Sequence, residues 1–305
     1  MNKEFLDLAE QLKSSVSCTV RLNELMSGHT SFKIGGPADI LVLPESIEQL
    51  REVLKVVKET VVPLTLLGNG SNVLVRDKGI RGIVIKLGNM LRHFYEAEDL
   101  LVFGSGYSLA LASYKAMECG RTGMEFAVGI PGSIGGAVYM NAGASDGEMQ
   151  NIVNCVRVMD LQGNERVLTA EELNFGYRKT SLQNSGLIVT EVTLKMPSGN
   201  KDEIKSKMDD FSHRRISKQP LEMPSAGSMF KRPPGYFAGT LIDQAGLKGY
   251  TVGGAQISTK HAGFVVNVGG ATAADVLQLI KDVQTKIKAG VGVELQPEVL
   301  VIGEE

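Results

Sequence analysis

The segment "TLLGNGSNVLV", at residues 65–75, constrains the fold more than any other part of the sequence. A short turn of small and polar residues separates two runs of apolar and β-branched residues, which indicates two strands. The turn consists of Gly68, Asn69, Gly70, Ser71 and Asn72. Backbone N–H groups of such a turn can converge on an anion such as a phosphate. Because a strand follows instead of a helix, the turn fits neither common nucleotide-binding pattern. It is either a strand–loop–strand phosphate cradle or a plain hairpin loop.

A second glycine-rich segment, "GIPGSIGGAV", favours the cradle interpretation. Its small residues let backbone approach a flat or phosphorylated ligand, and a helix is expected to follow it. The residues that we assign to this ligand-binding segment are Gly129, Ile130, Pro131, Gly132, Ser133, Gly135 and Gly136. The "GSG" at residues 104–106 is either a third point of approach or a turn. Two or three such loops together predict a bound dinucleotide.

Composition narrows the class of protein. With 305 residues the chain is long enough for roughly two domains. A net charge of −2 gives no bulk attraction to nucleic acid or to an anionic membrane. Three scattered cysteines without a CxxC pair indicate reduced thiols, and the acidic opening segment is unlike a secretory signal. No apolar run reaches the ~18 residues of a membrane span. We therefore expect a cytoplasmic protein.

The first two thirds of the chain predict an α+β fold. An amphipathic helix opens the chain, and a strand–helix–strand unit follows it, with Ser46 and Gln49 as the capping box of the helix. Short strands then dominate up to about Met196, interrupted by a helix at 109–118 and by one that begins in the second glycine segment. Since regular alternation of strands and helices is missing, a doubly wound parallel sheet is disfavoured.

The last third begins at a polar linker, residues 197–203, which leads into a helix ending near Lys218. A helix near 237–246 and a strand near 263–268 follow. Apolar periodicity predicts a last helix over 272–289, ended by Gly290. The final strand contains Pro297, which we expect at an edge or a bulge.

Three further segments combine reactive or charged residues with small ones. "FGYRKTS" places Arg178 after Tyr177, where a solvated surface arginine is the ordinary interpretation. "SAGSMFKRPP" places Ser228 in a small polar turn before Lys231 and Arg232, where a structural serine is the ordinary interpretation. In "LQPEV", Glu298 stands inside an apolar strand. A carboxylate in such a place needs a hydrogen-bond or ion-pair partner, or it has a functional role.

One segment of the chain is strongly basic. "FSHRRISKQP" places Arg214, Arg215 and Lys218 within about one helical turn, a basic face that is either solvated or able to bind a diphosphate. The histidines do not cluster, and no group has the spacing of metal ligands, so we expect no metal site. The absence of a G-x-S-x-G motif disfavours a Ser-His-Asp hydrolase.

The motifs together resemble the UDP-N-acetylenolpyruvoylglucosamine reductase family. "SFKIGGPAD", "LGNGSNVLVRD", "GIPGSIGGAVYMNAGA", "FGYRKTS", "SAGSMFKRP", "LIDQAGLKG" and "LQPEV" occur in the family's order, from about Leu22 to Ile302. Each motif is weak alone, and the ordered set is specific. The chain resembles the shorter subclass, because the tight spacing from Arg178 to Ser228 leaves little room for the additional substrate-capping loop of longer members.

The resemblance implies a three-part organisation. It implies an FAD-binding fold of the vanillyl-alcohol oxidase type in two subdomains, followed by an α+β substrate domain. We expect subdomain 1 at residues 1–66, joined by the C-terminal strand 293–305. We expect subdomain 2 at 67–200 and the substrate domain at 201–292. The Gly68–Asn72 turn would then hold the FAD pyrophosphate.

The implied reaction reduces the enolpyruvyl ether of UDP-N-acetylglucosamine to UDP-N-acetylmuramate, in peptidoglycan precursor synthesis. NADPH is the reductant and FAD is bound non-covalently. The resemblance implies Arg178, Ser228 and Glu298 as catalytic residues. A cation stabilises negative charge on the enolpyruvyl carboxylate, and a hydroxyl supplies a proton to the carbon beside the one that receives hydride. The implied substrate contacts are Tyr177, Arg214, Arg215, Lys218, Lys231, Arg232 and His261.

Two positions depart from the family pattern, and two alternatives stay open. Ser145 follows "NAGA" where many members have tyrosine, and Arg232 stands where other members have asparagine, which fits the shorter subclass. An FAD-dependent alcohol or lactone oxidase is one alternative, although neither glycine segment holds a histidine for covalent flavin attachment. A non-catalytic nucleotide-sugar-binding protein is the other. The expected partners are small molecules only.

Overall fold

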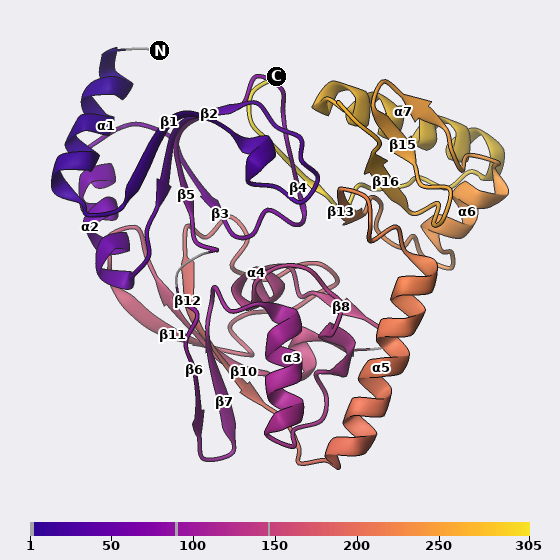
Figure 1. Ribbon diagram of the computed structural model, residues 1–305, viewed down its shortest axis with the longest axis horizontal. Coiled ribbons are helices and arrows are strands. Elements are labelled where there is room, and N and C mark those ends of the chain that lie inside the picture. The colour runs from indigo at the N-terminus through magenta and orange to yellow at the C-terminus, as the bar shows by residue number, and fades with distance from the viewer. Residues whose placement is uncertain (1–2, 89–90, 146) are drawn as a thin grey trace. The chain divides into compact units, whose positions relative to one another are not determined.

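The computed structural model describes residues 3–88, 91–145 and 147–305 (Figure 1). The chain forms two compact units. Unit 1 is made of residues up to 21, 40–69 and 83–215, and unit 2 of residues 22–39, 70–82 and 216–305. Both units combine helices with β-sheets, which confirms the α+β fold class. The three-part domain division stays a prediction.

Unit 1 is built on a five-stranded antiparallel sheet with the strand order β11-β10-β12-β7-β6. The strands are β6 (Phe94–Ala97), β7 (Leu100–Gly104), β10 (Val153–Met159), β11 (Glu165–Thr169) and β12 (Ile188–Lys195). Helices α3 (Leu109–Glu118) and α4 (Ile134–Tyr139) lie beside it in Figure 1, and their apolar residues share one buried core with β7, β10 and β12. This core fixes the segment around α4, which carries the second glycine motif.

Local sequence explains where α3 begins and ends. The Ser108 hydroxyl caps the helix by accepting a hydrogen bond from the Leu111 N–H at 3.4 Å. The chain leaves the helix at Gly120, whose φ of +66° is a left-handed conformation that favours glycine. The helix predicted over 109–118 is confirmed.

A second sheet has the order β1-β2-β5-β3. Its strands are β1 (Thr19–Leu25), β2 (Pro37–Leu43), β3 (Leu64–Leu67) and β5 (Ile80–Lys86), and its neighbours in the chain are α1 (Lys3–Ser15) and α2 (Ile47–Lys58). Ser46 caps α2 as predicted, because its hydroxyl accepts from the Gln49 N–H at 3.2 Å. The second half of the predicted capping box differs, since Gln49 Oε1 accepts from the Glu45 N–H at 2.8 Å instead of from the Ser46 N–H. Strand β3 pairs in parallel with β5 and ends at Leu67, so the first glycine turn begins at the end of a paired strand.

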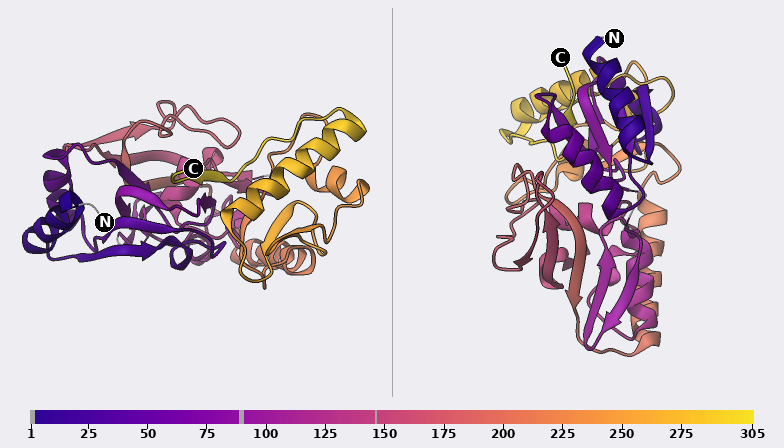
Figure 2. Two further views of the ribbon diagram at one scale, coloured as in Figure 1. Left: turned by 90° about the horizontal axis from the view of Figure 1, so that it is seen from above. Right: turned by 90° about the vertical axis from the view of Figure 1, so that its left-hand side faces the viewer.

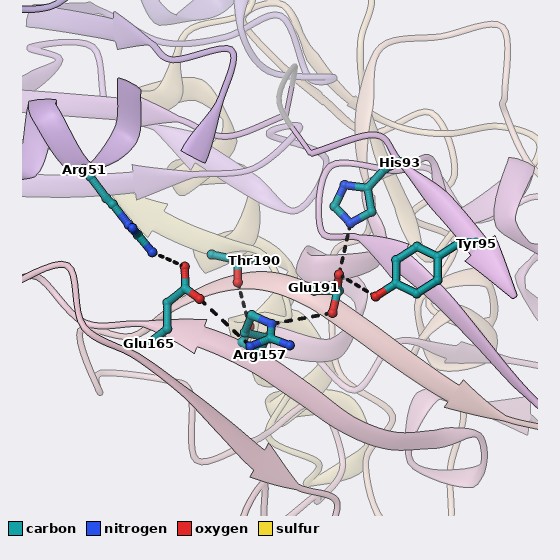
Figure 3. Close-up of polar contacts among 7 residues, drawn as sticks. All are labelled: Arg51, His93, Tyr95, Arg157, Glu165, Thr190 and Glu191. Atoms are coloured by element: carbon teal, nitrogen blue, oxygen red, sulfur yellow. Dashed lines mark hydrogen bonds and ion pairs between the residues drawn. The ribbon is translucent and has the colours of Figure 1, made fainter. Parts of the chain in front are cut away.

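An ion network joins α2 to the five-stranded sheet within unit 1 (Figure 3). Arg51 on α2 contacts Glu165 on β11 at 2.6 Å, and Glu165 also lies 4.0 Å from Arg157 on β10. Arg157 then contacts Glu191 on β12 at 3.6 Å. Glu191 also binds the His93 ring and the Tyr95 hydroxyl, each at 3.2 Å. The carboxylates thus alternate with cations across the strands.

Unit 2 packs two helices against a four-stranded sheet with the order β13-β16-β15-β14. These strands are β13 (Ser225–Ser228), β14 (Thr251–Val252), β15 (Ala255–Ile257) and β16 (Phe264–Asn267), and the helices are α6 (Ala238–Gln244) and α7 (Ala273–Val291). Figures 1 and 2 show α7 beside this sheet. Buried apolar residues of the helices and the sheet form one core. In the same unit β17 (Leu300–Ile302) pairs in parallel with β4 (Val73–Val75), so the end of the chain returns to the first glycine motif.

Two boundaries differ from expectation. The last helix does not end at Gly290 but continues to Val291, and Gly292 ends it with a φ of +71°. The final strand is shorter than expected, with Pro297 in an isolated bridge to Phe230 before β17 begins. α5 (Lys201–Lys218) ends where the sequence predicts. Within the described residues no helix has the length and hydrophobicity that a bilayer crossing requires.

Candidate active site

The second glycine segment is held by hydrogen bonds to residues 105–109, which include part of the "GSG" loop (residues 104–106) and the residues just after it. The Gly135 N–H donates to the Ser105 carbonyl at 2.9 Å, and the Ile134 N–H donates to the Tyr107 carbonyl at 2.9 Å. The Gly132 carbonyl accepts from the Leu109 N–H at 3.1 Å. The GSG loop therefore supports the second segment directly, a role that sequence spacing alone left open.

The two glycine segments meet at Ser133 in unit 1. A Cβ added to Gly68 would lie 3.6 Å from the Ser133 hydroxyl oxygen, and one added to Gly136 would lie 3.4 Å from the same atom. That hydroxyl caps α4 by accepting from the Gly136 N–H at 3.3 Å. Backbone from both motifs thus flanks one hydroxyl, an arrangement that fits a phosphate-bearing ligand.

The glycines of these segments fall into two groups. A Cβ at Gly135 would lie 2.7 Å from the Ser105 Cβ, so the fold itself needs glycine there. Gly68 and Gly136 meet only ordinary contacts, and Gly136 is exposed. Because none of the described protein atoms requires these two glycines, a ligand that approaches the backbone is a sufficient reason for them. The residues present therefore fit a dinucleotide.

The rest of the first turn lies in unit 2. Gly70 has a φ of +68° and packs against the His29 carbonyl, so glycine is required there for conformation and for space. The Gly70 carbonyl accepts from the Ser31 N–H at 3.1 Å. Asn72 donates from Nδ2 to the Glu298 carbonyl at 3.3 Å. The boundary between the units falls inside the turn, after Asn69.

Arg178 stands at the tip of a tight hairpin in unit 1. Gly176 and Lys179 exchange backbone hydrogen bonds of 2.9 and 3.1 Å, which leaves Tyr177 and Arg178 as the two turn residues. The Arg178 guanidinium donates to the Asn141 carbonyl at 3.4 Å and to the Gly143 carbonyl at 3.1 Å. It also lies 5.1 Å from the Tyr177 ring centroid. Backbone carbonyls thus orient a half-buried cation.

Ser228 and Glu298 are neighbours in unit 2. The Glu298 N–H donates to the Met229 carbonyl at 2.9 Å, and the Lys231 N–H donates to the Gln296 carbonyl at 2.8 Å. The Ser228 hydroxyl donates to the Phe230 carbonyl at 3.3 Å. The segments that carry the two predicted catalytic residues therefore run side by side, as a shared site requires.

The basic residues of α5 do not form one basic face, because each has different surroundings. Arg214 is bound to Asp210 through two contacts, 2.7 and 3.0 Å long. Arg215 turns instead toward the second glycine segment, where a Cβ on Gly129 would lie 2.5 Å from its Cδ. Burial lowers the pKa of the Arg215 guanidinium, and its buried Nε makes no hydrogen bond with the described residues. Lys218 is exposed in the last turn.

The remaining predicted substrate contacts lie in unit 2. The Arg232 guanidinium stacks 4.0 Å from the ring centroid of Phe237, which is exposed, and Lys231 is half-buried. His261 accepts from the Gly263 N–H at its Nδ1, 3.0 Å away, and burial lowers its pKa. An acceptor at Nδ1 and a lowered pKa both favour the neutral imidazole.

Sequence reasoning missed Asn141, which binds both the backbone of the Arg178 hairpin and the Arg178 guanidinium. It is fully buried, and its side chain binds the Gly176 carbonyl, the Glu148 carboxylate and the Gln150 N–H. The available signal was its place at the start of "NAGA", directly after the second glycine segment and its helix. Ser145, in the same motif, is exposed with a φ of +50° at the tip of the hairpin formed by β8 (Gly143–Ala144) and β9 (Gly147–Glu148).

Comparisons with known proteins agree with these features. Residues 219–302 match the family described as UDP-N-acetylenolpyruvoylglucosamine reductase, C-terminal domain, and residues 38–169 match an FAD binding domain. The chain is 49% identical over 286 residues to the UDP-N-acetylenolpyruvoylglucosamine reductase of Clostridioides difficile, covering 94% of both chains. It is 50% identical over 302 residues to that of Clostridium perfringens, covering 99% of this chain and 98% of the other. The crystal structure of the Thermus caldophilus reductase aligns with a TM-score of 0.79 at 38% identity, covering 94% of this chain and 99% of that one.

Proposed function

Because the chain belongs to the UDP-N-acetylenolpyruvoylglucosamine reductase family, we propose that it reduces the enolpyruvyl ether of UDP-N-acetylglucosamine to UDP-N-acetylmuramate, with NADPH as reductant and FAD as cofactor. The observation that carries this proposal is the sequence identity of 49–50% with two named reductases over 94–99% of this chain. Neither alternative function, an oxidase or a silent binding protein, has comparable support. The reaction belongs to peptidoglycan precursor synthesis, and we place it in the cytoplasm, where the three free cysteines stay reduced.

The glycine segments are the proposed FAD-binding residues. Bound FAD supplies hydride transfer between NADPH and the substrate. Gly68 and Gly136 let backbone approach the cofactor at Ser133, and the Gly70–Asn72 part of the turn adds further N–H groups. Non-covalent attachment follows from the lack of histidine in either segment. Arg215, held against Gly129, places a buried positive charge beside the second segment.

Arg178 and Ser228 have complementary roles in the second half of the cycle. Hydride arrival at the vinyl carbon leaves negative charge on the enolpyruvyl carboxylate system, which the Arg178 guanidinium stabilises. The Ser228 hydroxyl donates a proton to the adjacent carbon. Glu298 orients or assists this step from the neighbouring segment. The proposed substrate contacts are Tyr177, Arg214, Arg215, Lys218, Lys231, Arg232 and His261.

The test separates the two half-reactions in Ser228→Ala. NADPH should bleach the flavin at near the wild-type rate, because this step needs no proton from the hydroxyl. Reoxidation by the enolpyruvyl substrate should slow roughly 10²-fold or more, the scale of a lost general acid. Ser225→Ala, in the same strand, is the matched control and should leave both rates unchanged.

Several outcomes would reject the proposal. Purified protein that is colourless and cannot be reconstituted with FAD would exclude a flavoenzyme. Flavin that stays attached after denaturation would favour the oxidase alternative. Equal slowing of both half-reactions in Ser228→Ala would give Ser228 a structural role, and no slowing would remove it as the acid.

A further inference from the structure

The backbone of Arg178 is strained where its side chain is expected to act. Its φ is +55°, a left-handed conformation that is uncommon for a residue with a Cβ. Such a conformation persists only when surrounding contacts hold it. The hydrogen bonds between Gly176 and Lys179 close the hairpin, but they do not fix the direction in which its tip points. Contacts from outside the hairpin must therefore fix it.

Asn141 supplies these contacts from beneath the hairpin. Its Nδ2 donates to the Gly176 carbonyl at 3.0 Å and to Glu148 Oε2 at 3.1 Å. Its Oδ1 accepts from the Gln150 N–H at 3.0 Å. Since both amide donors and the acceptor are used, the orientation of the amide is determined by its partners. The side chain is completely buried, so water does not compete for these bonds.

Asn141 also contacts the Arg178 side chain through its own backbone. Its carbonyl accepts from Arg178 Nη1 at 3.4 Å, and the Gly143 carbonyl accepts from Nη2 at 3.1 Å. The φ of Asn141 is +41°, a conformation that asparagine adopts more readily than most residues. One residue thus holds both the backbone of the hairpin and the guanidinium at its tip.

Gln183 provides a second, weaker support. Its Nε2 donates to the Arg178 carbonyl at 3.1 Å and to the Tyr139 carbonyl at 3.2 Å. Tyr139 is the last residue of α4, so this amide also ties the hairpin to the segment that contains Asn141. Gln183 is only half-buried, so water competes for its hydrogen bonds more than for those of Asn141.

We propose that Asn141 is a positioning residue for Arg178, with Gln183 as its auxiliary. It sets the direction of the guanidinium before substrate arrives and so removes an ordering cost from the reaction. The proposal rests on the proposed function, because it matters only if Arg178 acts on the substrate. It assigns Asn141 no contact with substrate or cofactor.

The experiment uses Asn141→Gly and Asn141→Asp in the FAD-loaded enzyme. Glycine keeps the left-handed backbone and deletes the amide. Aspartate keeps the size and the acceptor but faces Glu148 and the Gly176 carbonyl without donors. We expect reoxidation by substrate to slow ~10–10²-fold, the scale of a small misplacement, while reduction by NADPH stays within about twofold of wild type. Asn174→Gly is the matched control, an exposed asparagine with a φ of +44° that should leave both rates unchanged.

A double-mutant cycle with Arg178→Ala separates positioning from general structure. If Asn141 acts through Arg178, Asn141→Gly should slow reoxidation no further once Arg178 is alanine. A further slowing of the same size in that background would overturn the proposal, as would an unchanged rate in both single variants of Asn141. If these variants fail to fold, Gln183→Leu replaces them in the same cycle, with a smaller expected effect and the same criterion. Failure of the proposed function is distinguishable, because the wild-type enzyme would then not be reoxidised by the enolpyruvyl substrate.

Discussion

Gly135 and Gly136 are adjacent in one helix, and we expect opposite results when each is replaced by alanine. A Cβ at 135 would lie 2.7 Å from the Ser105 Cβ and 3.1 Å from the Ser105 carbonyl oxygen. Optimal contacts need ~3.5–4 Å, so the loop must move by roughly 1 Å. Ser105 is buried and hydrogen-bonded to the Thr190 carbonyl at 3.0 Å, which resists this movement. At 136 the nearest atom is 3.4 Å away.

The two energies follow from these distances. Overpacking at 135 costs ~1–3 kcal/mol, and the better helix propensity of alanine returns about 1 kcal/mol, so Gly135→Ala should lower the free energy of unfolding by ~0–2 kcal/mol. Gly136→Ala gains the propensity without the clash and should raise the stability of the apoprotein by up to ~1 kcal/mol. The same methyl group should weaken FAD binding roughly tenfold or more if the cofactor approaches this backbone.

Urea denaturation of the two apoproteins and FAD titration measure these effects separately. The argument for Gly136 as a ligand-facing glycine is refuted if Gly136→Ala binds FAD with wild-type affinity. The packing argument for Gly135 is refuted if Gly135→Ala is stabilised as much as Gly136→Ala. Any loss of FAD affinity in Gly135→Ala should be accompanied by loss of stability.

Three further predictions concern stability. Burial lowers the pKa of His261 below ~6.5, its value in the unfolded chain, so the unfolded state binds more protons and the free energy of unfolding falls as the pH drops through this range. His261→Gln should flatten this part of a curve of stability against pH. An unchanged slope would contradict the assignment. Phe32→Ala should cost ~3–5 kcal/mol in urea denaturation, because Phe32 is fully buried in the core of unit 2, and a loss below ~1 kcal/mol would mean that this core collapses around the cavity. Arg51→Ala should cost at most ~1 kcal/mol, since its contact with Glu165 is solvent-exposed, and a larger loss would show that the network acts cooperatively.

Periodicity and caps predicted the longer helices well, because those signals lie within the element. Ser46 marked the start of α2, and the helix predicted over 109–118 matches α3. The end of α7 was placed two residues early because Gly290 and Gly292 are both plausible stops, and only the structure shows which one turns left-handed. Strand β1 was missed because its residues are exposed or half-buried along its whole length, so its sequence lacks a clear apolar face.

The sequence predicted which residues form the candidate site better than it predicted how they are arranged in space. Ser228 and Glu298 were chosen from separate motifs, and only the pairing of their segments makes them neighbours. Arg214 and Arg215 are adjacent in sequence, and helix geometry alone did not show that one would bind Asp210 while the other packs on Gly129. Asn141 was missed because its contacts with the Arg178 hairpin join residues 35 or more positions apart.

Helix α4 acts as a fixed spacer between two chemical tasks. It is capped by Ser133, where the glycine segments meet, and it ends at Tyr139, two residues before Asn141, which holds the Arg178 hairpin. One inserted or deleted residue would turn everything beyond it by about 100° and shift it by about 1.5 Å. The enzyme should therefore tolerate substitutions in this helix far better than insertions or deletions. Libraries of variants with altered loop lengths should leave residues 133–141 unchanged.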